Sequence, residues 1–117
     1  MISAQSTRML WCTYIWVDDV RPMPDYTLAY DYRYAVKAVD EFITTFLRLI
    51  EEGHTDFIID LDHDAGDYAP YGGDYIKIVE WLIENGYNTD NIHLVFHTMN
   101  PVGRENMEAL YARYWRN

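Results

Sequence analysis

The sequence predicts an α/β fold with about four mainly parallel strands and helices on both faces of the sheet. Short apolar segments rich in aromatic and β-branched residues alternate with longer segments in which apolar residues recur at helical spacing. Strands that alternate with helices are joined by right-handed crossovers, which produce a mainly parallel sheet. The length of 117 residues leads us to expect one domain over residues 1–117.

Four short segments are the candidate strands. The first runs from Leu10 to Val17, and the second is expected near Tyr32–Lys37, in a region where tyrosines alternate with other residues. The third and fourth are the apolar runs from Phe57 to Leu61 and from Ile92 to Phe96. Residues 1–8 are mostly polar, and we expect them to be frayed.

Three segments have the spacing of amphipathic helices. The first extends from Val39 to about Glu52 and is followed by Gly53, a typical C-terminal stop. Asp74 is the expected cap of the second, which Gly86 ends. Asn100-Pro101 predicts the start of the last helix, with an N-cap and then proline at the first helical position. Its expected inner stripe is Met107, Leu110, Tyr111 and Tyr114.

Composition narrows the classes of function. The formal net charge of −10 opposes broad adhesion to nucleic acid or to anionic membranes, but it permits a small phosphate ligand if a cation offsets the charge. Cys12 is the one cysteine, so no intrachain disulfide can form. Without a signal-peptide pattern or a membrane-length apolar run, a cytoplasmic location is expected. The 11 tyrosines fit core and interface packing, which leaves a homo-oligomer possible.

Acidic residues and histidines follow three of the four predicted strands. They are Asp18-Asp19, then Asp62-His63-Asp64, and then His97 with Asn100. Ligands of parallel sheets bind outside the carboxyl ends of the strands, so these positions indicate a site. Four carboxylates in one space need protons or a cation. Asp18, Asp19, Asp62 and Asp64 are therefore candidate ligands of Mg²⁺, or of Mn²⁺ if a histidine joins them. The alternative is that the aspartates cap separate turns and face water.

The two histidines have different candidate roles. His97 follows its strand directly, and an unperturbed histidine pKa of roughly 6.5 suits a general acid or base. His63 lies between two aspartates, where it would be a metal ligand, a second base or a hydrogen-bonded structural residue. For each, the alternative is an ordinary polar residue after a strand.

Candidate phosphate ligands surround the start of the last helix. Free backbone N–H groups at a helix N-terminus favour an anion, and Asn100 lies at this end. Gly103 permits close approach, and Arg104 offers a bidentate contact. Arg21 is a further candidate, although pairing with an aspartate explains it equally well. An ordinary capped helix is the alternative for the whole segment.

Three motifs together resemble one family. Trp16-Val17-Asp18-Asp19-Val20-Arg21-Pro22, Leu61-Asp62-His63-Asp64-Ala65-Gly66 and His97-Thr98-Met99-Asn100-Pro101-Val102-Gly103-Arg104 are similar to the cyclic-phosphate processing branch of receiver domains. The resemblance extends from about residue 14 to the C-terminus. It implies a receiver-like (flavodoxin-like) three-layer sandwich. That sandwich would be truncated, because neither the first crossover helix after Pro24 nor a fifth strand after the last helix is expected.

The resemblance also implies a function. Ordinary receivers bind Mg²⁺ with the acidic pair and accept a phosphoryl group on the aspartate after the third strand, which Asp62 matches. His97 stands where receivers keep a hydroxyl residue. The implied activity is that of a metal-dependent phosphoesterase acting on a cyclic phosphate of a nucleotide or an RNA end, with Asp62 alternatively acting as a nucleophile. A non-catalytic module that binds a phosphorylated nucleotide and a receiver-type signalling domain are the alternatives.

Overall fold

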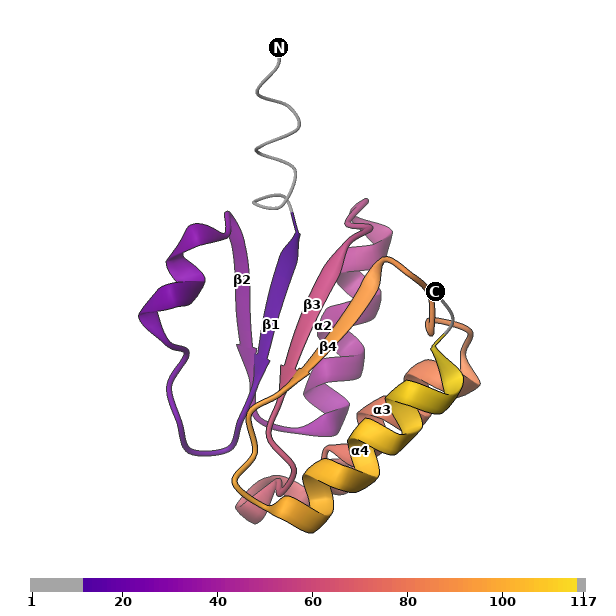
Figure 1. The fold of residues 1–117 in the computed structure, drawn as a ribbon. Coiled ribbons are helices and arrows are strands. Elements are labelled where there is room, and N and C mark those ends of the chain that lie inside the picture. The colour runs from indigo at the N-terminus through magenta and orange to yellow at the C-terminus, as the bar shows by residue number, and fades with distance from the viewer. Residues whose placement is uncertain (1–11, 116–117) are drawn as a thin grey trace.

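The computed structural model describes residues 12–115, and its strands form one parallel sheet in the order β2-β1-β3-β4 (Figure 1). The strands are β1 (Thr13–Val17), β2 (Tyr32–Val36), β3 (Phe57–Leu61) and β4 (Ile92–Phe96). The α-helices are α2 (Val39–Glu51), α3 (Ile76–Glu84) and α4 (Pro101–Tyr114), and η2 (Asp25–Ala29) and η3 (Gly66–Tyr71) are 3-10 helices. The predicted receiver-like α/β fold is confirmed, and the expectation for residues 1–8 lies outside the described residues.

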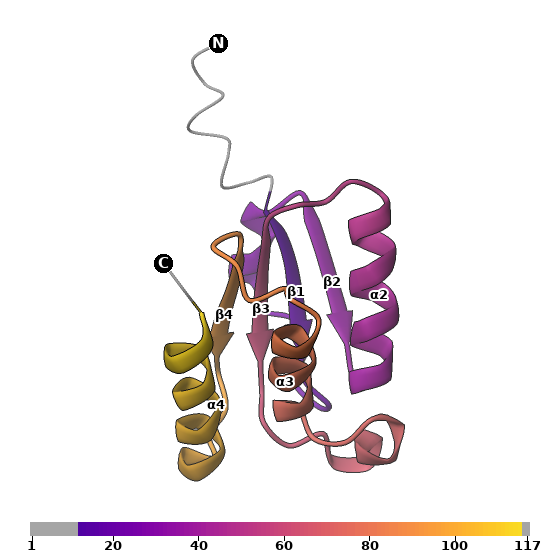
Figure 2. The same ribbon diagram turned by 90° about the vertical axis from the view of Figure 1, so that its right-hand side faces the viewer.

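One face of the sheet carries the hydrophobic core. Register pairs Ile15 with Ile59 and Ile59 with Leu94, so these side chains point to the same side. All three are buried in a core that also contains Phe42 and Phe46 of α2. The three α-helices lie on this side of the sheet (Figure 2), because their apolar stripes are buried against these strand residues.

The opposite face is covered differently. It carries Tyr14 and Trp16 of β1 and Asp60 of β3, which are buried, and Val95 of β4, which is 45% exposed. In Figure 2, η2 lies behind the sheet on this side. We expected helices on both faces of the sheet. Among the described residues, η2 is the one helical element on this second face, because the connection from β1 to β2 contains no α-helix.

Two local expectations about helices were wrong and one is confirmed. The side chain of Asn100 caps α4 by accepting from the N–H of Gly103 at 2.9 Å. Asp74 does not cap α3, because its carboxylate accepts instead from the N–H of Ala65 at 3.0 Å. Tyr114 is exposed, and Trp115 takes the buried place at this end of α4. No helix within residues 12–115 is long and apolar enough to cross a membrane.

Candidate functional site

The carboxyl ends of three strands meet at one place. Asp18 follows β1, Asp62 follows β3 and His97 follows β4. One carboxylate oxygen of Asp18, one of Asp62 and one ring nitrogen of His97 all lie within 4.8 Å of one another. The structure therefore brings together these three predicted site residues, which are far apart in the sequence.

Asp18 is a fixed anion at the centre of this cluster. Its side chain is buried, and Oδ1 accepts from the backbone N–H of Val20 at 2.9 Å and of Arg21 at 2.7 Å. Oδ2 lies 2.8 Å from Nε2 of His97. Burial raises the pKa of Asp18, but the two backbone donors and His97 outweigh it, so the pKa lies below its ordinary value.

His97 is held between two carboxylates. Its Nδ1 lies 2.6 Å from Oδ1 of Asp60, and its Nε2 faces Asp18. Burial lowers the pKa of His97, but the hydrogen bonds to Asp60 and Asp18 outweigh it and raise the pKa overall. Both ring nitrogens face carboxylate oxygens, an arrangement that favours the doubly protonated imidazole. Its ring stacks on Trp16 with 3.8 Å between centroids and 7° between planes.

Sequence reasoning missed the role of Asp60. This residue belongs to β3, is 1% exposed and accepts from the hydroxyl of Tyr14 as well as from His97. The hydroxyl of Tyr26 lies 3.4 Å from the same carboxylate. Burial, followed by the hydrogen bond to Asp60, raises the pKa of Tyr14, which keeps the phenol protonated as a donor. The available signal was an acid inside the apolar strand Phe57–Leu61.

Asp19 and Asp64 lie at the border of the cluster. Burial raises the pKa of Asp19, and the charges of Asp18, Asp62 and Asp64 raise it further. Gly66, the first residue of η3, packs directly against Asp19: a Cβ added to Gly66 would collide with the carboxylate of Asp19. Asp64 is exposed. The charges of the other three predicted carboxylates therefore act on Asp19. Of the four, Asp18 and Asp62 offer ligand atoms to the candidate group found within residues 12–115.

His63 lies between Asp64 and the start of α4. Its Nδ1 is 2.8 Å from Oδ1 of Asp64 and 3.5 Å from Nδ2 of Asn100. A Cβ on Gly103 would lie 2.7 Å from that nitrogen and closer still to two ring carbons. The close approach that Gly103 permits is therefore an approach of the His63 ring, and the N–H of Gly103 is already bonded to Asn100.

Within residues 12–115, neither candidate arginine forms an ion pair between its guanidinium and an aspartate of the cluster. Arg104 donates from Nε to Glu108 at 3.1 Å, one turn along α4, and both side chains are about half exposed. Arg21 contacts Asp18 through its backbone N–H, and the residue is exposed. Phosphate binding by Asn100, Gly103, Arg104 and Arg21 stays a prediction.

The chemistry of the donors fits a divalent cation. Carboxylate oxygens from Asp18 and Asp62 suit Mg²⁺, and the nearby imidazole nitrogen extends the set to Mn²⁺ only in its deprotonated form. Asp19 adds a carboxylate whose pKa is raised first by burial and then by the negative charges of its neighbours. A bound cation would offset the negative charge of these carboxylates. The chain's net charge of −10 shows that its own basic residues are too few to do so.

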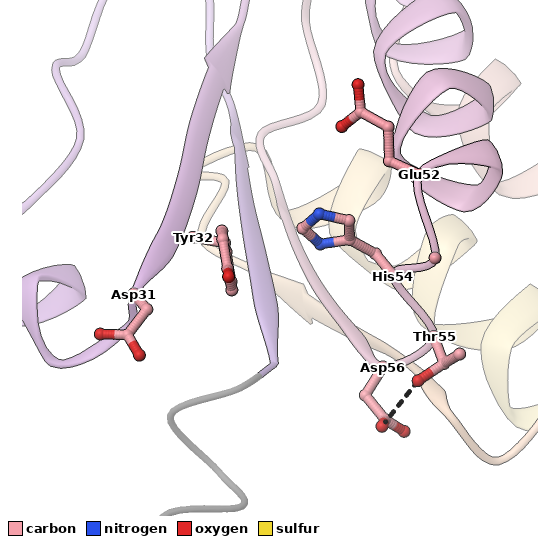
Figure 3. A pocket seen from close by; sticks show the side chains of 7 residues that line it. Asp31, Tyr32, Glu52, His54, Thr55 and Asp56 are labelled. Atoms are coloured by element: carbon pink, nitrogen blue, oxygen red, sulfur yellow. Dashed lines mark hydrogen bonds between the residues drawn. The ribbon is translucent and has the colours of Figure 1, made fainter.

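A cavity of about 460 Å³ lies elsewhere, at the amino ends of β2 and β3 (Figure 3). Tyr32 and His54 both line it, and their rings make an edge-to-face contact with 4.8 Å between centroids. The other residues that line it are Asp31, Glu52, Gly53, Thr55 and Asp56. This cavity is at the opposite end of the strands from Asp18, Asp62 and His97, so it is separate from their cluster.

Comparison with known families agrees with the geometry. A family model described as the cyclic-phosphate processing receiver domain matches residues 13–113. Comparisons with curated proteins and with solved structures found no match. The family match covers every strand and α-helix described above except the last residue of α4. The protein belongs to the cyclic-phosphate processing receiver domain family.

Proposed function

We propose that the protein is a metal-dependent phosphoesterase that hydrolyses a cyclic phosphate of a nucleotide or of an RNA end. One observation carries the proposal: an imidazole lies against the carboxylate of Asp18 and beside that of Asp62 at the carboxyl edge of a parallel sheet. This arrangement joins an acid–base group to hard oxygen donors in one place. The family supplies the class of substrate.

Asp18, Asp19 and Asp62 would hold Mg²⁺ or Mn²⁺, with Asp64 at the border. When bound, the ion supplies positive charge to a phosphate oxygen and lowers the pKa of a bound water. It also offsets the negative field that would otherwise repel an anionic substrate. Asn100 and Arg104 are the candidate donors to the nonbridging oxygens.

His97 is the group that moves protons in this mechanism. The oxygen of water forms a bond to phosphorus, the ring P–O bond breaks, and the leaving oxygen takes a proton from Nε2. Nε2 then takes the proton that the attacking water loses, which restores the protonated ring. The products are one hydroxyl group and one phosphate monoester. The position of Nε2 beside Asp18 supports this role, because the atom already lies at the cluster.

The test incubates the full chain with 2′,3′-cyclic and 3′,5′-cyclic nucleotides in the presence of Mg²⁺, Mn²⁺ or a chelator. Phosphorus NMR follows the appearance of monoester, which we expect only with an ion. His97→Ala should lower kcat by about 100-fold or more. His93→Ala is the matched control, because His93 is an exposed histidine of the same strand.

Three results would count against this proposal. Binding of a cyclic nucleotide without any product would identify a binding module. Turnover that His97→Ala leaves unchanged would place the activity elsewhere. Labelling of Asp62 by acetyl phosphate with Mg²⁺, in a protein that hydrolyses no cyclic phosphate, would favour a phospho-acceptor instead.

A further inference from the structure

Asp60 occupies an unusual position for a charged residue. It lies inside β3, its side chain is 2% exposed, and register places it beside Trp16 of the neighbouring strand. A buried carboxylate without partners would be costly, so its hydrogen bonds define what the residue does. Asp60 is on the sheet face opposite the helical core, so it is not a filler of that core.

The donors divide between the two oxygens of Asp60. Oδ1 faces Nδ1 of His97 at 2.6 Å, while Oδ2 accepts from the hydroxyl of Tyr14 and lies 3.4 Å from that of Tyr26. Tyr14 is itself 4% exposed, and its ring packs against that of Tyr30 with 5.1 Å between the ring centroids. The phenol therefore fixes the carboxylate, and the carboxylate fixes one edge of the imidazole.

A third contact restricts the remaining freedom of His97. Its ring lies flat on Trp16, whose Nε1–H donates to the backbone oxygen of Arg21 at 2.8 Å. The stack defines the plane of the imidazole, and Asp60 defines its rotation within that plane. Together they direct Nε2 toward Oδ2 of Asp18, at 2.8 Å.

We propose that Asp60, oriented by Tyr14, is a positioning residue that holds Nδ1–H of His97 and so assigns Nε2 as the atom that exchanges protons with the substrate. The inference rests on the proposed function for its catalytic consequence. Its structural part is independent of turnover. A carboxylate that accepts from one nitrogen of a histidine fixes the proton there. The other nitrogen of His97, Nε2, faces Asp18 at the cluster, where the substrate is proposed to bind.

The first experiment observes the imidazole directly, without substrate. Nitrogen-15 NMR of the histidines in the full chain, with the His97 signals assigned by their loss in His97→Gln, reports which nitrogen carries a proton. We expect a strongly hydrogen-bonded Nδ1–H in the wild type. Asp60→Asn should weaken that hydrogen bond and shift the resonance, whereas Asp90→Asn, at an exposed turn, should leave it in place.

The second experiment measures kinetics in the presence of the ion. Asp60→Asn should lower kcat by about 100-fold or more with little change in KM, because Asp60 does not touch the substrate. Tyr14→Phe is the milder variant, because it keeps the contact between Asp60 and His97; it should lower kcat less and shift the Nδ1–H resonance without abolishing it. Tyr114→Phe, an exposed tyrosine of α4, is its control.

The two readouts separate the two proposals. An Nδ1–H signal and a kcat that both survive in correctly folded Asp60→Asn, as judged by circular dichroism, would overturn the positioning role. If Asp60→Asn does not fold, folded Tyr14→Phe decides instead: an Nδ1–H resonance and a kcat that are both identical to those of the wild type would overturn the assignment. A wild type without turnover would defeat the proposed phosphoesterase, while the NMR comparison would still decide whether Asp60 fixes His97.

Discussion

The contact between Gly103 and His63 allows one substitution to be predicted with its sign. Gly103→Ala would place a methyl carbon 2.7 Å from Nδ1 of His63. Ordinary contacts of such atoms are about 3.5–4.0 Å, so the ring must move by about 1 Å. The backbone of His63 resists this shift, because its N–H donates to Asp62 at 2.8 Å and its carbonyl oxygen accepts from Tyr75 at 3.0 Å.

Two opposing terms set the magnitude. Overfilling a packed contact costs about 1–3 kcal/mol, whereas alanine is favoured over glycine in a helix by up to about 1 kcal/mol. The net loss of unfolding free energy is about 0–2 kcal/mol, which lowers Tm by up to about 8 °C in a domain of this size. In a His63→Ala background the collision is absent, so Gly103→Ala should instead stabilise by up to about 1 kcal/mol.

The assay is a double-mutant cycle measured by urea denaturation with circular dichroism. We expect a coupling of about 1–3 kcal/mol between positions 63 and 103, the size of the relieved collision. An identical effect of Gly103→Ala in both backgrounds would refute the reasoning, because the cost would then not arise from the imidazole ring.

Three further predictions concern the same edge of the sheet. Mn²⁺ at about 100 times its dissociation constant should stabilise the chain by about 2.7 kcal/mol. Thermal unfolding should show that this stabilisation is lost in Asp18→Asn and kept in the control Asp90→Asn. Stabilisation that survives in Asp18→Asn would place the ion elsewhere. Asp19→Asn should stabilise the chelator-treated protein near neutral pH, because burial and neighbouring charges raise the pKa of Asp19 and the stabilising contribution of its protonated form is lost as pH rises through that raised value. The difference should vanish well below the unfolded-state pKa of about 3.9, so equal urea midpoint shifts in acid and at neutral pH would contradict it. Asn100→Ala should cost about 1 kcal/mol, because it removes the cap that accepts from Gly103; an unchanged urea midpoint would contradict that role.

The strands that bear the site were predictable because local pattern and fold agree there. Phe57–Leu61 and Ile92–Phe96 are bounded as predicted, since each is a short apolar run followed by polar residues. The segment before β2 was harder. Its alternating tyrosines have the period of a strand, yet Asp25–Ala29 forms a 3-10 helix in which Thr27 is the buried residue. Periodicity alone does not separate these states when most side chains are exposed.

The convergence of Asp18, Asp62 and His97 followed from a general property of parallel sheets, so it was predictable without coordinates. The role of Asp60 was not, because it depends on which residue of β1 stands beside it and on where the ring of His97 turns. Those are properties of strand register and side-chain rotamers across three segments. The same limitation explains Asp74, whose carboxylate is bonded to Ala65 instead of capping its helix.

The thin covering of the second sheet face has a consequence for how this protein can vary. Through Tyr26, the η2 segment extends from the surface to the carboxylate behind His97. Changes in the length or composition of this crossover can therefore alter the hydrogen bonds of Asp60, and through them the orientation of the His97 ring, while every residue at the strand ends stays the same. Sequence changes between β1 and β2 can therefore change the reactivity of His97 without changing the sheet or the residues of the cluster.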